Sequence, residues 1–170
     1  MRKNVLRKLN FFIYVFIVLF AATLQSTIFK YFPLNYFQPD FVLIMTVYLG
    51  FKRESIEGGL LVILSAFILE ARSGAGKSFL LTAYTYSFVI TKLMSKVIVV
   101  PNRITVVMIA VGLGFFNKML NLLLLSLVGK AGNAIGHTFI YLVPSLLTQA
   151  AAALMLLEIF NLIDLKTFKD

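Results

Sequence analysis

The segment from Ala71 to Ser78 carries the residues most suggestive of nucleotide chemistry. Its sequence, ARSGAGKS, resembles the phosphate-binding pattern G-x-x-x-x-G-K-[ST], except that Ala71 stands where the first glycine belongs. That pattern requires a β-strand before it and a helix after it, and here an apolar helical segment precedes it. We therefore interpret the segment as a tight turn, in which Gly74 and Gly76 permit positive φ, and not as a nucleotide site.

The remaining candidates for catalysis or metal binding are isolated. His137 is the single histidine, we expect it in a loop, and the zinc-protease pattern H-E-x-x-H does not occur. The chain has no cysteine, which excludes thiolate metal sites, disulfides and a cysteine nucleophile. Ser73 precedes Lys77 by four residues, but nothing around the pair indicates an oxyanion hole. The sequence therefore predicts a protein that is not an enzyme and has no metal or other cofactor.

The composition is that of an integral membrane protein. Of the 170 residues, 60% are hydrophobic and 14% are charged, whereas soluble domains have about 45–50% and about 25%. The net charge is +9, but the basic residues form short clusters between apolar runs. Nucleic-acid binders instead carry them along a solvated face, so we expect membrane lipid and not nucleic acid as a partner.

We expect a single all-α domain over residues 1–170 with six transmembrane helices, because about 20 apolar residues cross the hydrocarbon core. The expected spans are Phe11–Phe32, Pro39–Phe51, Ile56–Leu69, Phe79–Val100, Ile104–Val128 and Thr138–Ile163. The second and third are short, so they either extend through their flanks or form a re-entrant pair.

The distribution of lysine and arginine predicts the topology, since cytoplasmic loops carry an excess of both. With the N-terminus inside, eleven of the sixteen basic residues are cytoplasmic, four are outside, and Lys118 lies within a span. Both termini are therefore expected in the cytoplasm. The first apolar stretch continues to Phe32, longer than a signal-peptide core, so we expect an uncleaved anchor.

Polar residues inside the spans are the most informative, because they are expensive in a membrane and usually face a partner. Counted from the cytoplasmic end, Gln25, Glu70 and Lys118 all lie about 20 Å deep. Asp40 opens the second span from outside, Arg72 lies just above the third, and Gln149 enters from outside to a comparable depth. The sequence thus predicts one polar layer near the outer side, with either a structural role or one in binding a ligand or partner. The candidate residues of this layer are Gln25, Asp40, Glu70, Arg72 and Lys118.

Charge and spacing suggest how the layer is organised. Glu70 ends its helix, where the dipole disfavours an anion, so we expect it to have a cation partner. Lys118 lies at matching depth, and Arg72 and Lys77 are near in sequence; we predict an ion pair between Glu70 and Lys118. Pro39 is expected at the first helical position, with Asp40 in the first turn as a helix-start or binding residue. Small residues also predict close helix approach at Gly58 and Gly59, at Gly112 and Gly114, and along Ala150–Ala153.

Several of these features occur together in one order that resembles a known family. Leu24-Gln25-Ser26 ends the first span, and Pro39-Asp40-Phe41-Val42-Leu43-Ile44 opens the second, leading to Tyr48-Leu49. Gly58-Gly59 follows, and then an acid before a glycine-rich turn, from Glu70 to Gly76. This arrangement resembles the rod shape-determining MreD family, most clearly over residues 24–78, although that family usually has Asp where this chain has Glu70.

The resemblance implies a non-enzymatic inner-membrane subunit of the machinery for lateral cell-wall elongation. The partners it implies are an MreC-like protein, the polymerase RodA, an elongation-type penicillin-binding protein and the MreB cytoskeleton. It also implies a fold similar to the substrate-binding subunits of energy-coupling-factor transporters. The alternative is therefore a small-molecule-binding subunit of such a transporter, with the polar layer as its pocket.

Overall fold

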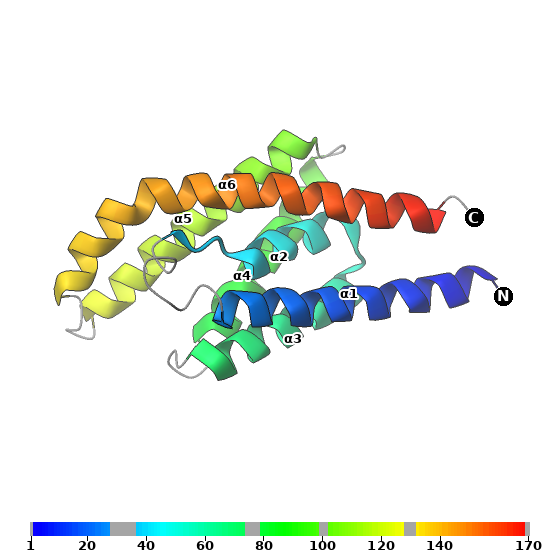
Figure 1. The fold of residues 1–170 in the computed structure, drawn as a ribbon, viewed down its shortest axis with the longest axis horizontal. Coiled ribbons are helices and arrows are strands. Elements are labelled where there is room, and N and C mark those ends of the chain that lie inside the picture. Colours follow the sequence, from blue (N-terminus) through cyan, green and yellow to red (C-terminus); the bar gives the residue numbers. More distant parts are fainter. Residues whose placement is uncertain (1, 28–36, 74–78, 99–101, 128–131, 169–170) are drawn as a thin grey trace.

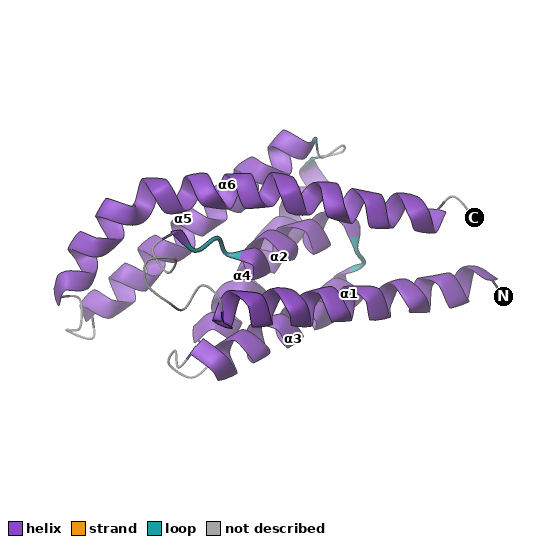
Figure 2. Ribbon diagram, in the orientation of Figure 1, coloured by secondary structure: helices purple, strands orange, loops and turns teal. Residues whose placement is uncertain are grey.

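The computed structural model describes residues 2–27, 37–73, 79–98, 102–127 and 132–168, and in these ranges all the regular secondary structure is helical (Figures 1 and 2). This confirms the expected all-α class. The helices are α1 (Arg2–Thr27), α2 (Phe41–Lys52), α3 (Ser55–Ser73), α4 (Phe79–Val97), α5 (Arg103–Leu127) and α6 (Gly132–Phe168).

The first and last helices are longer than the apolar runs on which the prediction was based. α1 already begins at Arg2, and α6 begins at Gly132 and continues to Phe168. Lys and Arg are good helix formers, so a helix need not end where hydrophobicity ends. His137 therefore lies within α6, and its expected loop position was wrong.

Among the described residues, two segments are long and apolar enough to cross a membrane, Arg103–Leu123 in α5 and Thr138–Asn161 in α6. Two shorter apolar helical segments occur at Phe12–Thr27 and Phe41–Lys52. The second of these is α2, whose 12 residues correspond to a length of about 18 Å. That is little more than half of a hydrocarbon core of about 30 Å.

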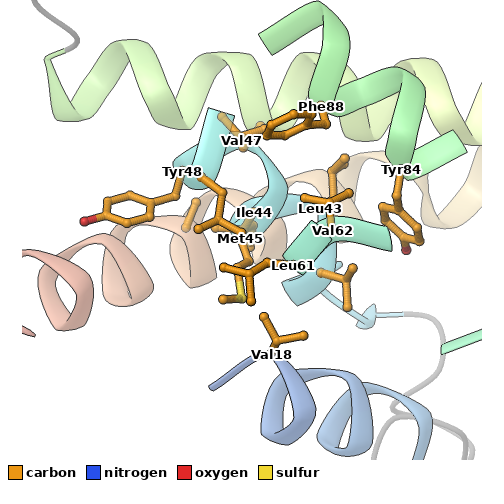
Figure 3. Packing of buried hydrophobic residues seen from close by; sticks show 14 of the residues in the cluster. Val18, Leu43, Ile44, Met45, Val47, Tyr48, Leu61, Val62, Tyr84 and Phe88 are labelled. Atoms are coloured by element: carbon orange, nitrogen blue, oxygen red, sulfur yellow. The ribbon is translucent and has the colours of Figure 1, made fainter. Parts of the chain in front are cut away.

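The short helix α2 lies at the centre of the bundle and packs against all five other helices. Every residue from Val42 to Gly50 is buried, which requires a helix that is apolar on all sides. Figure 3 shows its side chains radiating outward: Val47 points toward Phe88 of α4, and Met45 points toward α1 and α3. Because α2 has no exposed face, the other five helices form a shell around it.

A group of aromatic rings joins the end of α2 to α1 and α6. Tyr48 stacks on Phe160 with ring centroids 4.6 Å apart, and Tyr14 lies 6.4 Å from Tyr48. The guanidinium carbon of Arg53, just after α2, lies 4.4 Å from the centroid of the Tyr14 ring. A cation–π contact of this kind, near the carboxyl end of α2, also places positive charge where the helix dipole favours it.

The shell has two parts. In one part α3 packs against both α1 and α4, whereas α5 and α6 form a separate antiparallel pair that reaches the rest mainly through α2. α1 begins and α6 ends at the same end of the molecule (Figure 1). The two parts are thus joined through the central helix.

Glycines allow close packing at three positions. A Cβ atom on Gly50 would lie 2.8 Å from Thr91 Cγ2, and one on Gly58 would lie 3.0 Å from the Phe88 ring. At Gly114 it would lie 3.1 Å from the amide nitrogen of Gln149. The expected close approach is confirmed at Gly58 and Gly114, but it was wrong for Gly112, which has no neighbouring atom within 4 Å of that position.

Large apolar side chains are exposed on all five helices of the shell. On α1 they recur every three or four residues, as in Phe12, Phe16 and Phe20, so that they form a continuous stripe. Similar stripes follow the other four helices and include Leu60, Ile63 and Phe67 of α3, Val89, Leu93 and Val97 of α4, Ile104, Met108 and Phe116 of α5, and Val143, Leu147, Leu154 and Met155 of α6. In water this much exposed apolar surface would be unfavourable.

Candidate functional site

The polar groups that converge inside the bundle lie at the amino end of α2. We call this group the polar cluster, and it draws on α1, α4, α5 and α6 as well as on α2. Its members are Gln25, Asp40, Tyr84, Lys118, Ser145 and Gln149.

Asp40 is the N-cap residue of α2 and the centre of the polar cluster. Its Oδ1 accepts hydrogen bonds from the backbone N–H of Leu43, at 2.9 Å, and from Gln25 Nε2, at 3.2 Å. Its Oδ2 accepts a hydrogen bond from the hydroxyl of Tyr84, at 2.8 Å. Both carboxylate oxygens are therefore engaged by the protein itself. Pro39 precedes the cap, so its expected position inside the helix was wrong by two positions.

Gln25 and Gln149 complete the start of α2 from two other helices. Gln25 Oε1 accepts from the backbone N–H of Val42, at 3.2 Å, and Gln149 Oε1 accepts from the backbone N–H of Asp40, at 3.1 Å. The N–H of Phe41 donates to the carbonyl of Pro39. The first N–H groups of a helix have no partner within that helix, and they are costly if unpaired in an apolar medium.

The same two glutamines hold neighbouring helices in place. Gln149 Nε2 donates to the carbonyl of Ala110 on α5, at 3.3 Å, and its amide packs against Gly114. The backbone carbonyl of Gln25 accepts from Gln38 Nε2, at 3.0 Å. Both glutamine side chains are buried, so each uses its donor and its acceptor to connect helices across the start of α2.

Lys118 contributes the cation of the polar cluster. Its Nζ donates to Ser145 Oγ on α6, at 2.6 Å, and Ser145 Oγ in turn donates to the carbonyl of Leu142. The ammonium group is close enough to the carboxylate of Asp40 to interact with it electrostatically. Lys118 thus lies near Asp40 but forms no direct ion pair with it.

Glu70 and Arg72 do not join the polar cluster. Glu70 Oε2 accepts from the backbone N–H of Leu81, at 2.9 Å, in the first turn of α4. The expected ion pair between Glu70 and Lys118 is absent from these two described side chains, so that prediction was wrong. The positive end of the α4 dipole serves Glu70 in place of the lysine. Arg72 is exposed in the last turn of α3.

The structure therefore brings together three of the five predicted residues, Gln25, Asp40 and Lys118, and adds Gln149 at the expected depth. Tyr84 was missed. The signal was present, because a tyrosine hydroxyl in an apolar helix needs a hydrogen-bond partner when it is buried. Gly74 and Gly76, the predicted tight turn, lie outside the described residues.

The carboxyl end of α2 is capped by a lysine. Lys92 Nζ of α4 donates to the carbonyls of Arg53, at 2.7 Å, and Gly50, at 3.3 Å. An anion at the amino end and a cation at the carboxyl end both match the dipole of α2. At the same end of the bundle, Arg103 of α5 forms an exposed ion pair with Glu158 of α6.

The arrangement of the polar cluster is that of a buried cap. Its carboxylate, amide and hydroxyl groups are hydrogen-bonded to one another and to backbone groups, which stabilises a short helix beginning inside the bundle. Within the described ranges, no three His, Cys, Asp or Glu residues gather as a metal site would require. No protein-family model, curated protein or solved structure matches this chain.

Proposed function

We propose that the chain is a multi-pass membrane protein that acts as a non-enzymatic docking subunit. The observation that carries this proposal is the inversion of polarity: large apolar side chains cover the five outer helices, while hydrogen-bonded polar groups lie at the centre. A bilayer satisfies such a surface, and so do the transmembrane helices of other subunits. We propose both termini in the cytoplasm, since α1 begins and α6 ends at one end of the bundle and the basic residues favour that side.

The polar cluster supports a docking role over a small-molecule-binding one. In a ligand site, a few polar groups point toward the ligand to fix its orientation. Here Asp40, Gln25 and Gln149 direct their polar atoms to the backbone and to one another. The polar cluster therefore stabilises the bundle, and we assign the docking of other subunits to the outer faces of the five surrounding helices.

The identity of the partners follows from the resemblance of the motif order to the MreD family. We propose that the chain belongs to the inner-membrane machinery for lateral cell-wall elongation. Its direct partner would be an MreC-like protein, in a complex with RodA, an elongation-type penicillin-binding protein and the MreB cytoskeleton. Gln25 and Asp40, which lie in two of the motifs quoted for the resemblance, together cap α2. These two motifs would thus supply the cap of the central helix α2.

Depletion in the native rod-shaped cell tests this assignment. Cells that lose the chain should become wider and rounder, and re-expression should restore their shape. A variant with Asp40→Ala and Gln25→Ala should fail to restore shape because it does not accumulate in the membrane, while Asn121→Ala, on an exposed position of α5, should restore it. Depleted cells that keep their width and length would refute the proposal.

A further inference from the structure

The end of the bundle at which α2 and α4 finish carries a compact group of lysines. Lys52 is the last residue of α2, and Lys92 and Lys96 lie one turn apart on α4. Gly50 lets the two helices approach closely there, since a Cβ atom on it would overlap Thr91. The contact between α2 and α4 therefore brings the three lysines to the same place.

These lysines are not neutralised within the described part of the chain. Lys92 is half-buried, and its ammonium group donates only to the carbonyls of Gly50 and Arg53, while Lys52 and Lys96 are exposed. The acids at this end are Glu54 and Glu57, where α3 begins, and Glu158, which is paired with Arg103. No carboxylate of a described residue forms an ion pair with any of the three lysines. The three ammonium groups are therefore available to bind an external anion.

An apolar stripe runs along α4 beside the lysines. Val89, Leu93 and Val97 follow one another at intervals of four residues, and their exposed fractions rise from 48% to 56% to 81% toward the lysine end. Each of the last two follows a lysine directly in sequence, so the apolar row and the basic row lie on adjacent faces of the helix. A ligand that matches both rows has a negatively charged head and a hydrocarbon chain.

We propose that the ends of α2 and α4 form a binding site for the headgroup of an anionic phospholipid. The phosphate would lie between Lys52 and Lys96, above the half-buried Lys92, and an acyl chain would follow the stripe of Val89, Leu93 and Val97. Basic groups between membrane helices bind such headgroups in this way. This inference rests on the membrane location in the proposed function, but not on the wall-elongation partners.

Native mass spectrometry of the purified, delipidated chain in nonionic detergent tests the site. The protein is titrated separately with phosphatidylglycerol and with phosphatidylcholine carrying the same acyl chains. We expect one tightly bound phosphatidylglycerol per chain, and Lys52→Gln with Lys96→Gln should weaken it about 25-fold, at about fivefold for each lysine near an anionic group. Equal binding of the two lipids by the unaltered protein would overturn the proposal.

A charge-matched control separates a site from general attraction. Lys166→Gln with Lys169→Gln removes two positive charges from the C-terminal part of the sequence, outside α2 and α4, and should leave binding of phosphatidylglycerol within about twofold of the unaltered protein. If both double variants lose affinity equally, the lysines act only as diffuse charge and the proposal is wrong. Unchanged thermal unfolding of both variants in the same nonionic detergent checks that each is folded.

A soluble probe separates the two parts of the ligand. Glycerol 3-phosphate carries the phosphate without acyl chains, and at the same concentrations we expect no retained adduct. Binding as tight as that of the lipid would overturn the role of the α4 stripe. Because this titration uses the chain alone, its outcome is independent of whether wall-elongation proteins are recovered with the chain.

Discussion

The cap on α2 makes Asp40 the residue whose loss should be most damaging. Asp40→Ala removes the N-cap, which contributes about 1 kcal/mol. It also removes the acceptor for Gln25 and Tyr84, and interhelical hydrogen bonds in membrane proteins contribute about 0.6 kcal/mol on average and up to about 1.7 kcal/mol. We therefore expect a loss of about 2–3 kcal/mol in the free energy of unfolding. Asp40→Asn keeps one oxygen for the cap and should cost less than half of this.

A double-mutant cycle with Tyr84→Phe isolates the bond between the two helices. Tyr84→Phe should destabilise the unaltered protein by about 1 kcal/mol but have little effect after Asp40→Ala, because the hydroxyl then has no carboxylate to contact. Unfolding in mixed detergent and SDS micelles, followed by far-UV circular dichroism, measures each free energy.

Ser126→Ala serves as the control for this cycle. Its hydroxyl is exposed and bonds only to the carbonyl of Leu123 in its own helix. It should therefore show no coupling to Tyr84→Phe. A coupling energy between Asp40 and Tyr84 below about 0.3 kcal/mol, or an equal loss for Asp40→Ala and Ser126→Ala, would refute the interpretation of the polar cluster as the cap of a buried helix.

Three further predictions concern stability in the same unfolding assay. Gly50→Ala should destabilise the protein by about 1–3 kcal/mol through overpacking against α4. Gly112→Ala adds a Cβ atom with no neighbour within 4 Å, so it should be neutral or slightly stabilising. Equal effects of the two substitutions would contradict the close contact at Gly50. The losses in unfolding free energy caused by Glu70→Ala and Lys118→Ala should be additive, since the two side chains have different partners. A coupling energy above about 0.5 kcal/mol would indicate an ion pair between them and contradict the structure. Lys92→Met should cost about 1–2 kcal/mol, because the carbonyls at the carboxyl end of α2 lose their donor, and an unchanged midpoint would contradict that cap.

Much of the helical architecture could be predicted from the sequence, because the apolar runs and the turn residues divide the chain into the segments that form helices. The central position of α2 could not. Its sequence from Phe41 to Phe51 is apolar on every side, so its periodicity does not distinguish a helix facing lipid from one surrounded by protein. Its length was the better signal, since 12 residues are few for a full crossing.

The sequence predicted how deep the polar residues of the candidate site lie, but not which way each side chain points around its helix. Counting residues placed Gln25, Lys118 and Gln149 at comparable heights, and the structure brings all three to the start of α2. The same count gave no information on which way Glu70 points around its helix. Charge signs alone then favoured a lysine as its partner, whereas the backbone N–H at the start of α4 supplies the positive end of a dipole.

The most direct test of the docking proposal is purification of the tagged chain from its native membrane in a mild detergent, with quantitative mass spectrometry of the proteins that elute with it. We predict enrichment of an MreC-like protein and an elongation-type penicillin-binding protein. We expect Phe12→Ser with Phe16→Ser, which disrupts the apolar stripe of α1, to reduce this enrichment. Recovery of transporter ATPase subunits in their place, with no wall-elongation protein above the level of an untagged control, would contradict the proposal.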